Sequence, residues 1–296
     1  IYKIVSGDDC KTCQFYKEES EVYKMLIQYD EEYFVDVSKD MANFLYQIMN
    51  SNIDIPAADL MVVRFDEREN RYLALLKMNY KEFYTHKTQA KDEGNENQII
   101  KYKSILPTES QRLQEAAIIN LSDLSVYAIE KKYDVNGEKT NYFTYLFLKC
   151  SSRLSPKSKL SIVTKAVENV QNGYYDETKQ YEANMKAKNI IHQELEENGS
   201  FTVETIADKI FEEKPQLKQE FQEKMEKYDM VHEEIRPQSE KTVKKYETQV
   251  LKTDSGIEIK IPMKEYNDPS SVEFITEADG SVSVLIKKIG CLTARI

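Results

Sequence analysis

Several residue types are scarce in this chain, and each scarcity excludes a class of protein. Tryptophan is absent and glycine occurs only 8 times in 296 residues, and neither G-x-x-x-x-G-K-[ST] nor G-x-G-x-x-G is present, which excludes the common phosphate loops. The 4 cysteines are too few for a disulfide framework at this size, which predicts a reducing cytoplasm. No apolar run approaches the ~18 residues that a membrane span needs, so no membrane partner is expected.

The charge balance is acidic, with 51 Asp and Glu against 41 Lys and Arg and a net charge of -10. A DNA-binding domain is typically basic, because neutralised phosphates release counterions and supply much of the affinity. The acid is concentrated away from the C-terminus, since residues 1–150 carry 19 bases and 25 acids, residues 151–236 carry 13 and 17, and residues 237–296 carry 9 and 9. Any contact with a polyanion is therefore expected to be local.

The first half of the chain changes from helical to extended patterns. Helices are predicted within residues 18–50, where apolar residues recur at helical spacing, with Ser38 as the N-cap of the second helix. Apolar runs then predict an antiparallel sheet of about five strands, and the polar stretch 82–97 is expected to be a mobile loop. The predicted strands are 58–65, 71–78, 98–106, 116–121 and 125–133, the last leading to a type I′ turn at Asn136-Gly137.

The second half begins with helical patterns and ends in strands. Residues 140–150 and 155–228 predict helices, and the residues from Lys241 onward predict strands, with a hairpin turn at Asp279-Gly280. This order predicts an α+β protein, mainly an antiparallel sheet with N-terminal helices, a central helical segment and a C-terminal β-module. The expected domains are 1–150 (α+β with antiparallel sheet), 151–236 (helical segment) and 237–296 (C-terminal β-hairpin module).

No group of residues favours catalysis or metal binding. Cys10-x-x-Cys13 has ligand spacing, but zinc needs two further ligands, and the other cysteines and the 3 histidines form no paired motif. The pair is interpreted as two incidental surface thiols of a reduced protein. No nucleophile motif of the G-x-S-x-G type is present, and Asp66-Glu67 fits a solvated turn better than a nuclease centre. The chain is expected to be non-enzymatic, without catalytic residues, metal or cofactor.

Three stretches, in the same order, resemble one bacterial family. Residues 58–80 resemble its central hairpin, residues 141–160 its Phe-rich helix and the Ser/Leu-rich break that follows, and residues 256–289 its C-terminal β-module. Over about residues 15 to 296 the chain resembles nucleoid-associated proteins of the thirty-seven-kilodalton type. The resemblance implies a cytoplasmic, nucleoid-located, non-catalytic protein that binds double-stranded DNA as a homodimer and organises the chromosome. These stretches identify a fold rather than a site.

Two clusters combine basic and aromatic side chains and are the predicted DNA contacts: Lys101 and Lys103 around Tyr102, and Lys241, Lys244 and Lys245 beside Tyr246. The second cluster lies in the neutral C-terminal segment and is expected to hold the main contact. The alternative for both is edge-strand lysines that prevent aggregation. Residues 202–228 begin like a helix-turn-helix, but the acids of their second helix fit a structural or dimer role better than a major groove.

Two functional hypotheses remain open. The first is a nucleoid-associated protein that binds double-stranded DNA with little sequence selectivity, because phosphate contacts carry no sequence information. The second is an acidic dimeric interaction scaffold that docks onto DNA-processing proteins without binding DNA directly, which the net charge favours. Salt dependence separates the two, because direct phosphate contacts give a steep slope and a scaffold gives little binding at any salt.

Overall fold

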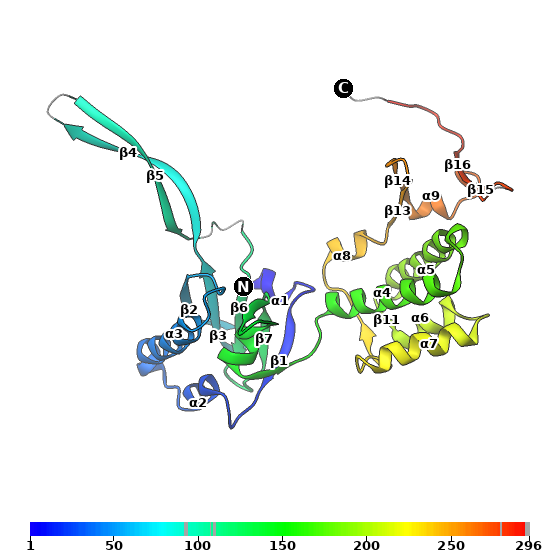
Figure 1. Cartoon of the computed structure of the whole chain (residues 1–296). Coiled ribbons are helices and arrows are strands. Elements are labelled where there is room, and N and C mark those ends of the chain that lie inside the picture. Colours follow the sequence, from blue (N-terminus) through cyan, green and yellow to red (C-terminus); the bar gives the residue numbers. More distant parts are fainter. Residues whose placement is uncertain (92–93, 107, 109–110, 279, 294–296) are drawn as a thin grey trace. The chain divides into compact units, whose positions relative to one another are not determined.

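The chain folds into two units (Figure 1), and the computed structural model describes residues 1–91, 94–106, 108, 111–278 and 280–293. The first unit is Ile1–Ser155 and the second is Pro156–Ile296. Both contain helices and antiparallel strand pairs, which confirms the predicted α+β class.

A six-stranded antiparallel sheet is the centre of the first unit. Along each strand, successive side chains point to opposite faces: Leu73 and Leu75 enter one hydrophobic cluster and Ala74 enters another. In the spatial order β10-β1-β7-β6-β3-β2, the strands are Cys150–Ser152, Lys11–Phe15, Val126–Ile129, Glu115–Asn120, Asn70–Asn79 and Ala58–Glu67.

Helices cover both faces of this sheet unequally. The larger cluster lies under α2 (Glu21–Ile27), α3 (Phe34–Asn50) and the π-helix η2 (Phe143–Leu148). On the opposite face, the short helix α1 (Tyr2–Val5) adds Ile4 to a smaller cluster. A 3-10 turn, η1 (Glu31–Tyr33), precedes α3 directly. The predicted N-cap Ser38 is therefore wrong: it lies one turn inside α3, where its hydroxyl donates to the Phe34 carbonyl at 2.7 Å.

The β-structure differs from the sequence prediction in two respects. Strands β1 and β10 were not predicted, because both are short and mix polar with apolar residues. The stretch 82–97 is not a loop: it forms β4 (Lys81–Lys91) and β5 (Gly94–Ile105), a hairpin separate from the sheet, and the predicted strand 98–106 belongs to this hairpin.

One predicted turn of the first unit is confirmed. Strands β8 (Tyr133–Val135) and β9 (Glu138–Thr140) pair with each other and are joined by Asn136 and Gly137. Both joining residues have positive φ, 55° and 87°, as a type I′ turn requires.

The second unit is a helical core followed by small hairpins. Helices α4 and α5 pack against α6 and α7 around a core that includes Val163, Ile191 and Phe221. The helices are α4 (Pro156–Tyr174), α5 (Glu177–Asn198), α6 (Val203–Ile210) and α7 (Pro215–Glu226), with β11 (Phe201–Thr202) paired to β12 (Glu234–Ile235).

The C-terminal segment contains two hairpins. The elements are α8 (Glu240–Lys244), β13 (Thr248–Lys252), β14 (Glu258–Pro262), α9 (Met263–Tyr266), β15 (Val272–Thr276) and β16 (Val282–Ile286). Strand β13 pairs with β14 and β15 with β16, as the alternating pattern predicts. The extended pattern was wrong at Lys241, which lies in α8, because Ser239 caps a short helix there. In the predicted turn of the last hairpin, Gly280 has φ 85° and Asp279 lies outside the described residues.

Candidate nucleic-acid interface

The β4–β5 hairpin, called the arm below, continues β3 and β6 beyond the sheet (Figure 1). Its strands pair from Lys81 opposite Ile105 to Lys91 opposite Gly94, with one irregularity after Lys81. Strand β4 has 11 residues, which at about 3.3 Å per residue makes the arm about 35 Å long. Residues 81–90 are all exposed, so neither face of β4 is packed against the rest of the protein.

One face of the arm combines a lysine with aromatic, imidazole and amide groups. Lys101 lies opposite Tyr84, with its Nζ atom 6.0 Å from the ring centroid, and it forms an ion pair with Glu82. Further along the same face, Thr88 donates a hydrogen bond of 2.6 Å to Asn97 Oδ1. The remaining opposed pair is His86 with Ile99, of which Ile99 is 81% exposed.

The other face carries Phe83 opposite Tyr102 and Lys87 opposite Gln98. Both aromatic rings are exposed, and so is Lys87. Lys103 belongs to β5, but its side chain lies outside the described part of the structure.

The arm therefore presents the side-chain types that bind nucleic acid. Lys, Thr, Asn and Gln donate to phosphates, and Asn and Gln also read base edges. Residues 81–105 contain 5 lysines and 4 acids in a chain whose net charge is -10. A two-stranded ribbon is one of the shapes that enters a B-DNA major groove, which is about 12 Å wide.

A buried ion pair fixes the root of the arm. Lys77 and Glu115 are opposed on β3 and β6, at the end of the ladder from which the arm continues. Both side chains are 0% exposed, and Lys77 Nζ lies 3.6 Å from Glu115 Oε2. Lys77 also donates to the Pro56 carbonyl at 3.1 Å and to Asn79 Oδ1, while the Asn79 amide donates to Glu115 Oε2 at 3.0 Å.

This root network carries a strong electrostatic penalty. Burial lowers the pKa of Lys77, although Glu115 acts in the opposite direction. Burial also raises the pKa of Tyr142, whose hydroxyl has no hydrogen-bond partner among the described residues. Charged groups without water are stable only when paired and hydrogen-bonded. The network is therefore sensitive to the loss of either partner.

The C-terminal cluster is divided by its environment. Lys241 and Lys244 lie on α8 and Lys245 follows it, all three exposed, with Lys244 paired to Glu240 at 3.3 Å. Tyr246 is only 9% exposed and packs in the core of the second unit, with its hydroxyl 3.3 Å from the Thr164 hydroxyl. The lysines are thus available to a ligand, whereas the aromatic ring is part of the core.

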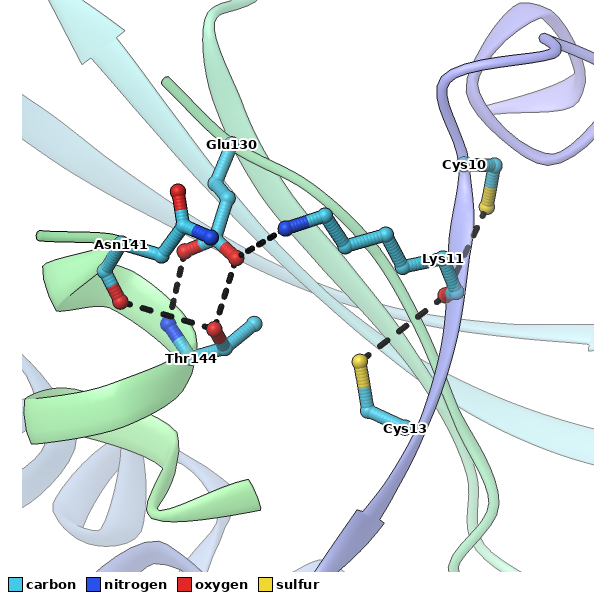
Figure 2. A network of polar contacts seen from close by, with 6 residues as sticks. All are labelled: Cys10, Lys11, Cys13, Glu130, Asn141 and Thr144. Atoms are coloured by element: carbon cyan, nitrogen blue, oxygen red, sulfur yellow. Dashed lines mark hydrogen bonds and ion pairs between the residues drawn. The ribbon is translucent and has the colours of Figure 1, made fainter. Parts of the chain in front are cut away.

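A second polar network joins three elements of the first unit (Figure 2). Glu130, whose side chain is 0% exposed, accepts from Lys11 Nζ at 2.9 Å and from the Thr144 hydroxyl at 2.6 Å. Its other oxygen accepts from the Thr144 backbone N–H at 3.0 Å, at the start of η2. Because Glu130 closes both a strand and a helix end, the network has a structural explanation.

The two cysteines beside Lys11 are not both surface thiols, which corrects the sequence interpretation. Cys13 is 1% exposed and enters the core of the first unit with Cys150, because alternation along β1 turns it inward. Burial raises the pKa of Cys10 to about 11 and that of Cys13 to about 12. Thiols with raised pKa are poor nucleophiles at neutral pH, which argues against a redox role.

Sequence reasoning missed Tyr84, Lys87 and Asn97, because all three lie in the stretch interpreted as a loop. A ribbon exposed on both faces has no alternation of apolar and polar residues to reveal its strands. The available indication was composition, since Phe83 to Thr85 and Ile99 to Tyr102 are rich in β-branched and aromatic residues.

Two searches of the described residues bear on other functions. In that part of the chain, no three His, Cys, Asp or Glu side chains are grouped as a metal site, so the expected absence of metal stays a prediction. None of the helices described is both long and apolar enough to cross a membrane.

Comparison with known proteins agrees with the resemblance of the three sequence stretches. The family model described as "NA37: Nucleoid-associated protein YejK" matches residues 1–290. No curated protein sequence matches the chain.

Proposed function

Because the chain belongs to the NA37 family of nucleoid-associated proteins, we propose that it binds double-stranded DNA through the arm, with little sequence selectivity and without catalysing a reaction. The proposal includes a homodimer in the nucleoid of a bacterial cytoplasm. Lys87, Lys101 and Lys103 contact phosphates, and the lysines of α8 provide a second, weaker contact.

The exposed arm is the observation that carries this proposal. A ribbon with both faces open to solvent gains little stability from packing, so a fold that keeps it has another use for it. Its lysines and amides suit phosphates, and its width suits a groove. Phosphate contacts fix orientation without reading sequence, which supports weak selectivity.

The net negative charge does not oppose contact at the arm. Charges in water are screened over about 8–10 Å at physiological ionic strength. An arm about 35 Å long holds its distal part several screening lengths from the sheet. Lys87 and Lys101 therefore act on a phosphate largely without the acids of the remaining chain.

The test is duplex binding by fluorescence anisotropy, with two duplexes of equal length and unrelated sequence over a series of salt concentrations. We expect similar affinities for both and a steep negative slope of log K against log salt. The variant K87E/K101E/K103E removes three contacts, and each should flatten the slope by about 0.9.

A matched variant controls for total charge. Lys17, Lys24 and Lys39 are exposed lysines of the same unit outside the arm, so K17E/K24E/K39E makes the same change in net charge. It should keep most of the slope. Equal losses in both variants would exclude the arm as the site, and barely measurable wild-type binding at any salt would favour the scaffold hypothesis.

A further inference from the structure

The two edges of the six-stranded sheet are unlike each other. At one edge, β10 has 3 residues and ends at Arg153. At the other edge, β2 has 10 residues and, among the described residues, pairs only with β3. Its ten pairs with β3 run without a register shift. One edge is short, and the other is long and regular.

Strand β2 has none of the usual devices that prevent edge pairing. Natural edge strands carry Lys or Pro, bulges or a covering element, because a row of free N–H and C=O groups recruits another strand. Residues 58–67 contain neither Lys nor Pro, and the central Leu60–Val63 is uncharged. Met61 is 45% exposed. The edge is therefore open to pairing with a further strand.

A groove follows this edge on the α3 side of the sheet. One hollow of about 440 Å³ lies between α3 and β2 around Leu45, Tyr46 and Leu60. A neighbouring hollow shares Ala42 and Leu60 with it and extends toward Val35. Tyr46 and Val35 are 65% and 59% exposed. A strand added at this edge would place alternate side chains into the groove.

We propose that β2 pairs antiparallel with β2 of a second copy of this chain, so that two six-stranded sheets join across a two-fold axis. The proposal rests on the homodimer of the proposed function and identifies its interface. A strand that fills the groove must carry apolar side chains with a period of two on the α3 face. The second copy supplies these as Leu60 and Val62, which face the α3 cluster in its own fold.

Self-complementarity favours a second copy over another protein. A two-fold contact uses one patch on both partners, so protruding and hollow parts must lie on the same surface. Here the exposed Val35 and Tyr46 protrude beside the groove that their counterparts would enter. An identical strand also meets antiparallel pairing without any additional sequence requirement.

The first experiment is sedimentation equilibrium of the full chain without DNA. The wild type should be a dimer, and M61K should weaken the dimer at least tenfold, because a charge on the edge opposes pairing. The control is I53K, which changes a 99% exposed apolar residue between α3 and β2. A monomeric wild type, or a dimer of M61K as tight as the wild type, would overturn the proposal.

The second experiment depends on milder substitutions, in case M61K does not fold. In a C291S background, M61C, V62C and V63C are oxidised one at a time. Residues beside the two-fold axis face their own copies with Cβ atoms about 4.5–5.5 Å apart, within reach of a disulfide after small shifts. One of the three should give a covalent dimer and I53C should not. Absence of cross-linking in all three contradicts the pairing, whatever the outcome of the DNA titration.

Discussion

The arm and the α8 segment carry similar sequence patterns in opposite environments. Each combines lysines with a tyrosine, and each was predicted as a strand. On the arm, Tyr102 is 53% exposed and the ribbon extends into solvent. At α8, Tyr246 is 9% exposed, and the lysines lie on a short helix beside the core that this ring enters.

The difference shows that a basic-aromatic pattern does not define a binding surface by itself. The aromatic ring decides, because an exposed ring is available for contact and a buried ring anchors the segment. The ion pairs divide in the same way. The arm is held at its root by a pair with 0% exposure on both sides, whereas the Lys244–Glu240 pair of α8 is open to water.

The largest expected effect tests these two ion pairs. K77M leaves the Glu115 carboxylate buried without its partner and should lower the free energy of unfolding by about 3–5 kcal/mol. K244M removes an exposed pair and should change it by about 0.5 kcal/mol or less. Urea denaturation measures both. Because paired apolar replacements are often tolerated, K77M/E115L should recover much of the loss.

Similar values for K77M and K244M would contradict the distinction between root and surface. A K77M protein that is folded but binds DNA poorly would sharpen it, because the root would then position the arm. Circular dichroism and the anisotropy titration separate those outcomes.

The next effect compares the two basic clusters directly. K241E/K244E/K245E should flatten the salt slope by no more than about 1.8, the value for two contacts, because Lys244 already has Glu240 as a partner. The arm variant K87E/K101E/K103E should lose about 2.7. The reverse order would place the main contact at α8.

The sequence was sufficient for elements whose one face is buried. Strands β2, β3, β6 and β7 all have apolar runs, because the sheet they form has covered faces. The arm lacks that pattern and was taken for a loop. At α8, Ser239 and Glu240 formed a helix start that could have been recognised before the extended pattern was extrapolated through Lys241.

The root network could not be predicted, although both of its charges were visible. Lys77 ends one apolar run and Glu115 precedes another, 38 positions later in the sequence. Only the register of β3 against β6 brings them together. The inward turn of Cys13 likewise required the position of β1 within the sheet.

The smallest effect tests the two tyrosines. Y246F removes a hydroxyl that lies 3.3 Å from the Thr164 hydroxyl, in a core where burial raises the pKa of Tyr246. A buried hydrogen bond contributes about 0.5–1.5 kcal/mol, so thermal or urea unfolding should show a loss of that size. Y102F removes an exposed hydroxyl and should leave stability unchanged. If Y102F destabilised the protein as much as Y246F, the ring of Tyr102 would have to be anchored, and the arm would not be the free ribbon that the DNA contact requires.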